Sequence, residues 1–159
     1  MKKIKVVVIG AGSECFGRGA IADLLSSEEL KDTYLTISLV DIDESALDRM
    51  FRFAQLLKKY RHSNAKIDAT TDRREALKGA NYVITAVARK RHELWDRDFM
   101  PFAFGLKHIY GENGGPGAAF HTIRSLHLMV PIVKDMEKIS PDALLINYTN
   151  PGGSSGSLR

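Results

Sequence analysis

Residues 6–13 read Val-Val-Val-Ile-Gly-Ala-Gly-Ser, and this stretch decides the fold that the sequence predicts. The uninterrupted β-branched run from Val6 to Ile9 predicts a strand buried on both faces, as in parallel sheets. The run ends at a Gly-rich turn, and a helical pattern follows from about Arg18. A strand, a Gly-rich turn and a helix N-terminus in this order predict a phosphate cradle. Glycines let the backbone approach the ligand, and the helix N-terminus favours negative charge.

Four more apolar strands, separated by helical stretches, continue the pattern. The expected strands are 34–40, 66–70, 82–87 and 143–148, and the expected helices are 20–25, 45–59, 92–104 and 118–139, with a helical turn after Asp72. Pro101 should break or kink its helix, Pro131 should bend its own, and 110–117 should be a loop. The alternation predicts an α/β fold, a doubly wound parallel sheet of Rossmann type. About five strands are expected in the order 3-2-1-4-5, without a sixth.

The composition is that of an ordinary globular domain. The chain has 159 residues, of which 44% are hydrophobic and 26% charged, enough for one domain with a real core. No apolar run approaches the ~20 residues of a membrane helix, so no membrane partner is expected. The net charge of +4 is mild and the basic residues are scattered, which argues against a nucleic-acid partner. A single cysteine, Cys15, favours a reducing, cytoplasmic location.

The last residues differ from the rest. Residues 152–159, Gly-Gly-Ser-Ser-Gly-Ser-Leu-Arg, have the composition of an engineered flexible linker, with a natural Gly/Ser loop as the alternative. Residues 1–151 are therefore the expected dinucleotide-binding domain, and the chain is expected to be part of a longer protein. Its fifth strand would then be an apolar sheet edge, which suggests a homodimer through that edge. A monomeric mass by light scattering would exclude such a dimer.

The Gly-rich turn carries an incomplete dinucleotide fingerprint. Gly10 and Gly12 begin it, but Cys15 stands where the third glycine is expected, and Gly17 follows two positions later. The strand before the turn and the helix after it favour nucleotide binding over a turn without a ligand.

Asp41 directly continues the predicted second strand. A carboxylate there can accept hydrogen bonds from a ribose diol and repel a 2′-phosphate, which predicts NAD rather than NADP. Asp43 is the alternative ribose ligand, or else a helix cap, a role that Ser45 could also fill.

Residues after the predicted fourth strand are candidates at the same site. Ala86 is small enough to let a dinucleotide lie close, although core packing explains it equally well. The charge run from Arg89 to Arg91 suits an anionic substrate or the pyrophosphate, or is simply solvated. The spacing of His108, His121 and His127 is not that of metal ligands, so no metal site is expected within the chain.

Several motifs together resemble the family 4 glycoside hydrolases. This family comprises NAD- and divalent-metal-dependent α-glucosidases, α-galactosidases, α-galacturonidases and 6-phospho-glycosidases. The motifs lie in order along 1–151, at 8–13 with Phe16, 39–42, 79–84, 114–117 with Phe120 and Arg124, and 141–151. The resemblance implies that the sugar C3 hydroxyl is oxidised by hydride transfer to NAD⁺. A base then removes the C2 proton, the aglycone leaves by elimination, water adds, and the hydride returns.

The resemblance also implies roles for single residues. The expected cofactor ligands surround the turn and the strand ends: Gly10, Gly12, Ser13, Phe16, Asp41 and Ala86. The first three would hold the pyrophosphate, and Asp41 would hold the adenosine ribose. Asn150 would contact substrate hydroxyls, Arg89 would border the sugar, and Glu112 would lie near the leaving-group oxygen as a catalytic residue.

The family's metal-binding cysteine and histidine, and its tyrosine base, lie beyond the Asn-Pro strand end. The Mn²⁺ ligands are therefore expected outside this chain, which should bind NAD but lack turnover alone. One alternative is a fragment of a lactate/malate-dehydrogenase-like oxidoreductase, since that group also ends its fifth strand with Asn-Pro. The other is an engineered Rossmann scaffold without activity.

Overall fold

The computed structural model describes residues 2–88, 91–107 and 114–150. In order, its elements are β1 (Lys2–Ile9), α1 (Phe16–Ser26), η1 (Glu28–Leu30), β2 (Thr33–Val40), α2 (Glu44–Tyr60), β3 (Lys66–Thr70), α3 (Arg73–Leu77), β4 (Tyr82–Thr85), α4 (Arg91–Asp98), α5 (Met100–Ala103), α6 (Gly115–Ile139) and β5 (Leu144–Asn147). The chain divides into two compact units. The first comprises Met1–Ala86 with Asp135–Ile146, and the second comprises Val87–Lys134 with Asn147–Arg159. The predicted tail at 152–159 lies outside the described residues.

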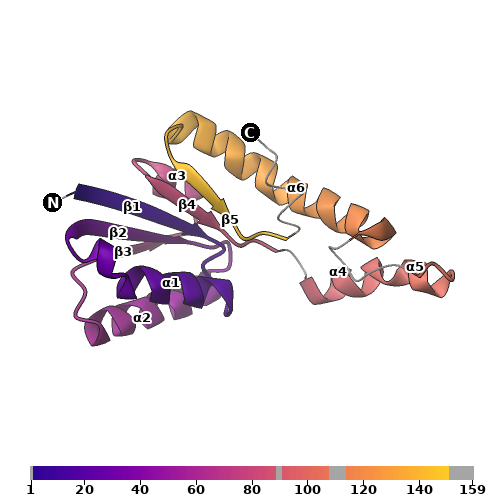
Figure 1. The fold of residues 1–159 in the computed structure, drawn as a ribbon, viewed down its shortest axis with the longest axis horizontal. Coiled ribbons are helices and arrows are strands. Elements are labelled where there is room, and N and C mark those ends of the chain that lie inside the picture. The colour runs from indigo at the N-terminus through magenta and orange to yellow at the C-terminus, as the bar shows by residue number, and fades with distance from the viewer. Residues whose placement is uncertain (1, 89–90, 108–113, 151–159) are drawn as a thin grey trace. The chain divides into compact units, whose positions relative to one another are not determined.

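A five-stranded sheet is the centre of the first unit, in the order β3-β2-β1-β4-β5 (Figure 1). The predicted strand order is confirmed. The parallel register places Ile9 beside Val40 on one side and beside Thr85 on the other. The carboxyl ends of β1, β2 and β4 therefore form one row, and the residues that follow them meet at one edge of the sheet.

Both faces of β1 are buried, as its uninterrupted apolar run predicts. Val6 and Val8 belong to a hydrophobic cluster that Ile21 of α1 and Leu47 of α2 complete on one face. Val7 is fully buried on the other face, where α3 contacts β1 and β2. Covering both faces removes the sheet's apolar surface from water, which is the main stabilising contribution to such a fold.

Most predicted elements are present, but some boundaries are different. The helix expected from residue 20 begins at Phe16, and the strand expected to reach 87 ends at Thr85. The loop prediction for 110–117 is wrong at its end, because α6 begins at Gly115 with Pro116 in its first turn, where a missing N–H costs no helical hydrogen bond. Residues 110–113 lie outside the described residues.

The two prolines behave differently. The helix expected around Pro101 is broken at Phe99, and Pro101 lies in the first turn of the second helix, α5. The long helix α6 continues through Pro131 without a break.

Ser38 is a buried hydroxyl in the middle of the sheet. Its Oγ has no hydrogen-bond partner among the described residues, and Ser38 lies in one row with Val7 and Val83. A buried hydroxyl without a partner keeps its desolvation cost uncompensated. We expect Ser38→Ala to leave the free energy of unfolding unchanged or to raise it by up to about 1 kcal/mol. Denaturant midpoints would measure this, with Val83→Ala as a control that should lose about 2 kcal/mol. A comparable loss in Ser38→Ala would mean that the hydroxyl is satisfied.

Candidate functional site

The Gly-rich turn is tied to the ends of its two neighbouring strands. The N–H groups of Gly10 and Ala11 both donate to the carbonyl oxygen of Val40, at 2.9 and 3.0 Å. On the other side, the Ala86 N–H donates to the carbonyl oxygen of Ile9 at 3.0 Å. Gly10 has a φ of 86°, which glycine adopts without strain. These bonds place Ala86 next to the turn, as predicted.

Asp41 is held in place by backbone groups on both of its oxygens. The Gly12 N–H donates to Oδ2 at 2.8 Å, and the Asp43 N–H donates to Oδ1 at 3.0 Å. A carboxylate has about four acceptor positions, so the two oxygens can still accept hydrogen bonds from a ligand. A Cβ on Gly12 would lie 2.7 Å from Asp41 Oδ2 and from Ala46 Cβ. Glycine is therefore required for this close approach.

Asp43 caps a helix. Its Oδ1 accepts the Ala46 N–H at 3.0 Å and caps α2, so the helix-cap prediction is confirmed for Asp43. Ile42, between the two aspartates, is 91% exposed. This apolar side chain beside the candidate ribose ligand was not singled out from the sequence.

Gly17 allows the helix to pack closely against the Gly-rich turn, which is the role of the third glycine in the fingerprint. A Cβ at this buried position would lie 2.1 Å from the carbonyl oxygen of Ala11. The first turn of α1 therefore lies directly against the Gly-rich turn. The sequence signal was present, because a glycine inside the first turn of a helix marks a close approach.

The N–H groups of the turn are mostly used within the protein. The Ser13 N–H donates to the Gly10 carbonyl at 3.1 Å, and Ser13 Oγ accepts the Phe16 N–H at 3.2 Å. The backbone N–H groups of Glu14 and Cys15, just before α1, make no hydrogen bond within the described chain. These two N–H groups and the Ser13 hydroxyl hydrogen remain as donors for an anion at a helix N-terminus.

Asn150, a candidate substrate ligand, belongs to the second unit. Its carbonyl oxygen accepts the Ser125 hydroxyl at 2.6 Å and lies 3.2 Å from His121 Nε2. Arg89 and Glu112, the other predicted substrate and catalytic residues, lie outside the described residues. The residues that contact Asn150 cannot be identified from the sequence, because nothing in their spacing connects them with it.

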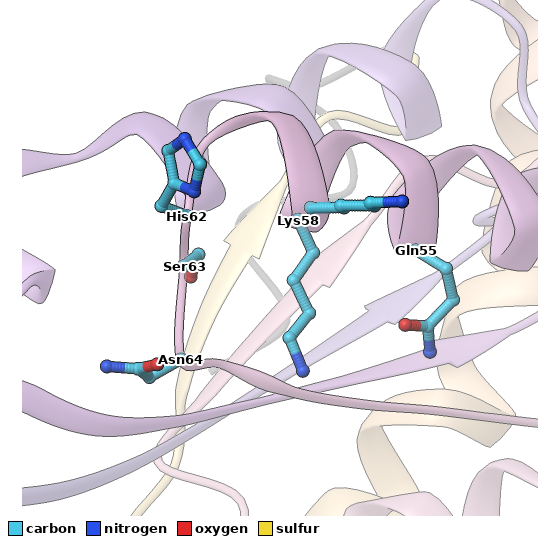
Figure 2. Close-up of a pocket in the computed structure, with 6 residues that line it drawn as sticks. Gln55, Lys58, His62, Ser63 and Asn64 are labelled. Atoms are coloured by element: carbon cyan, nitrogen blue, oxygen red, sulfur yellow. The ribbon is translucent and has the colours of Figure 1, made fainter.

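A polar hollow of about 580 Å³ lies at the opposite end of the sheet from the turn. It is lined by Gln55, Lys58, Lys59, His62, Ser63 and Asn64. In Figure 2, Gln55 and Lys58 extend to the same side of α2. His62 has a φ of 51°, and the Ser63 N–H donates to the Lys58 carbonyl at 3.1 Å. This geometry is that of a helix C-cap, so the hollow is explained by the end of α2.

Within the described residues, no three His, Cys, Asp or Glu side chains lie close enough together to hold a metal ion. The described helices also include none with the length and hydrophobicity needed to cross a membrane.

Known proteins resemble this chain over most of its length. Residues 5–158 match the sequence profile of a family described as family 4 glycosyl hydrolase. An α-glucosidase of Erwinia rhapontici is 40% identical over 149 residues, which cover 92% of this chain and 32% of that protein. The chain thus spans about a third of the length of the curated relatives that it matches.

Solved structures also resemble this chain. A 6-phospho-β-glucosidase from Thermotoga maritima, determined with manganese, NAD⁺ and glucose-6-phosphate, is 26% identical and superimposes with a TM-score of 0.79. That match covers 94% of this chain and 35% of the other. A lactate dehydrogenase from Cryptosporidium parvum is 18% identical with a TM-score of 0.60, over 98% of this chain and 41% of the other. At that identity the likeness extends to the fold only.

Proposed function

The chain belongs to family 4 of the glycosyl hydrolases, and we propose that it is the NAD⁺-binding part of such an enzyme. One observation carries the proposal. The Asp41 carboxylate lies at the end of β2, held by the Gly12 and Asp43 N–H groups beside a Gly-rich turn. This geometry suits a ribose diol and opposes a 2′-phosphate.

The residues around the turn fit the rest of the dinucleotide. The absent Cβ at Gly12 lets the turn lie directly against Asp41 and Ala46. The pyrophosphate would accept hydrogen bonds from Glu14 N–H, Cys15 N–H and the Ser13 hydroxyl. Gly10 and Gly12 would then act by shaping the turn, since their own N–H groups bind protein oxygens. The exposed Ile42 would offer the adenine an apolar contact.

Two more residues complete the proposed cofactor site. Phe16, the first residue of α1, is 43% exposed beside the Ser13 hydroxyl that accepts its N–H. Ala86 is hydrogen-bonded to the residue before the turn, and its small side chain would let the dinucleotide lie close.

In the proposed reaction, bound NAD⁺ would supply a reversible acceptor for the hydride that leaves C3 of the sugar. The chain's own contribution is to hold the cofactor and to orient the substrate. The Asn150 amide would donate to one sugar hydroxyl and accept from another. Arg89 would border the sugar and Glu112 would act near the leaving-group oxygen. These roles rest on the family resemblance.

The described residues do not supply the metal. Because no three ligand side chains come together among them, the ligands of Mn²⁺ would have to come from other residues of the enzyme. We propose that the chain by itself binds NAD⁺ without turning over a glycoside. We also propose a cytoplasmic location and a homodimer that forms through β5, an edge strand of the sheet.

Calorimetric titration tests the proposal. We expect this chain to bind NAD⁺ and to bind NADP⁺ at least tenfold more weakly, because the 2′-phosphate would meet the Asp41 carboxylate. Absence of heat with NAD⁺, for a sample whose unfolding is cooperative, would contradict the proposal and favour a scaffold without a ligand.

Assays separate the remaining alternatives. Chromogenic glycosides with NAD⁺ and Mn²⁺, and 2-keto acids with NADH, should both give no turnover. Reduction of a keto acid would favour a dehydrogenase, and release of the chromophore would show that the chain is a complete catalyst.

A further inference from the structure

Asp98 is a buried carboxylate at the end of α4, with its side chain 2% exposed. Its Oδ2 accepts a hydrogen bond from Arg124 Nη2 at 2.5 Å and lies 3.5 Å from His121 Nδ1. A carboxylate at this depth is costly unless it is paired and hydrogen-bonded. Arg124 and His121 are three residues apart on α6 and so share one face of the helix.

The same face of α6 holds the backbone of Asn150. The Ser125 hydroxyl donates to the Asn150 carbonyl oxygen at 2.6 Å, and His121 Nε2 lies 3.2 Å from that oxygen. A carbonyl oxygen only accepts, so Nε2 is the donor in this contact. Asp98 Oδ2 lies 3.5 Å from Nδ1, on the opposite edge of the ring. Ser125 is buried, so its bond is shielded from competing water.

The residues before Asn150 are restrained as well. Thr149 is 2% exposed, and its Oγ1 accepts the Val87 N–H at 3.1 Å. The Thr149 N–H donates to Asn147 Oδ1 at 2.9 Å. In the sequence Asn150 precedes a proline, which restricts its backbone to extended conformations. A fixed backbone in turn limits the side-chain rotamers that Asn150 can adopt.

We infer that Asp98, His121, Arg124 and Ser125, the Asn150 anchor, position the Asn150 amide for a polyhydroxylated sugar. The inference rests on the proposed function, which assigns Asn150 to the substrate. The four are positioning residues, since they act through the Asn150 backbone. An amide that must donate to one hydroxyl and accept from another needs a defined orientation.

Nuclear magnetic resonance tests the anchor without any ligand. The order parameter of the Asn150 side-chain amide should be near the rigid value of about 0.85 in the unaltered chain. It should fall below about 0.6 in Ser125→Ala and recover in Ser125→Thr, which keeps the hydroxyl. Glu93→Gln, which removes an exposed ion pair on α4, is the matched control and should change nothing at Asn150. Equal order in Ser125→Ala and the unaltered chain would overturn the inference.

A second arm links the anchor to the sugar. With NAD⁺ present, the variants would be titrated with D-glucose and D-glucose 6-phosphate. Ser125→Ala should keep its NAD⁺ affinity and bind the sugar roughly three- to tenfold more weakly, the effect of about one hydrogen bond. Unchanged sugar affinity with a disordered Asn150 would overturn the inference. If even the unaltered chain binds neither sugar, the assignment of Asn150 to the substrate fails, while the amide order still reports on the anchor.

Discussion

Replacing Gly17 with alanine is expected to lower the free energy of unfolding by about 3 kcal/mol. The added Cβ would lie 2.1 Å from the carbonyl oxygen of Ala11 and 2.8 Å from its carbonyl carbon. Both are backbone atoms, so no rotamer change can relieve the overlap. Either α1 or the Gly-rich turn must move, and NAD⁺ affinity should fall with stability.

Gly19 provides the matched control, because it lies in the same helix. A Cβ at Gly19 would meet nothing within 4 Å. Alanine is the better helix former, so Gly19→Ala should raise the free energy of unfolding by about 0.5–1 kcal/mol. Urea unfolding of both variants measures the difference. A Gly17→Ala protein as stable as the original would mean that α1 is not packed against the turn.

Asp41→Ala is expected to weaken NAD⁺ binding by at least about a hundredfold. The variant would lose two hydrogen bonds from the ribose diol to a charged acceptor, each contributing about 1.5–3 kcal/mol. It would also leave the Gly12 and Asp43 N–H groups without their partner, so the turn would be less ordered. Discrimination against NADP⁺ should fall as well, because the charge that repels the 2′-phosphate is gone. Calorimetric titration with both nucleotides measures each effect.

Asp43→Ser tests whether the neighbouring carboxylate contributes. Serine retains an oxygen that can cap α2, so stability should change little and NAD⁺ affinity should stay within about threefold. A large loss of affinity in Asp43→Ser would move the ribose ligand to Asp43. Full affinity in Asp41→Ala would remove Asp41 from the site.

The sequence predicted the sheet because its signals are local. The run from Val6 to Ile9, the glycines after it and the apolar periodicity of α2 each lie within a few consecutive residues. Boundaries were harder to predict. The start of α1 at Phe16 and of α6 at Gly115 were placed too late, because glycine and proline disfavour helix interiors but are compatible with a first turn.

The candidate site was predicted in part. The nearness of Gly10, Asp41 and Ala86 followed from the sheet order, since parallel strands bring their carboxyl ends to one edge. For Gly17 the sequence offered only a hint of close packing, because the contact itself is a distance through space to Ala11. The anchor at Asn150 could not be predicted either, because it also depends on contacts between residues far apart in the sequence. Its donors lie on a helix 25 and 29 residues earlier in the chain.

The sequence by itself therefore determined which elements form, their order in the sheet and which residues follow the strand ends. It did so because hydrophobic periodicity and the positions of glycine, proline and capping residues are properties of neighbouring residues. Only the tertiary structure decided which polar groups are already satisfied. The Gly12 N–H binds a carboxylate 29 residues away, and the Asn150 carbonyl binds α6. Hydrogen bonds between distant residues depend on how the elements pack, and packing decides which groups remain available to a ligand.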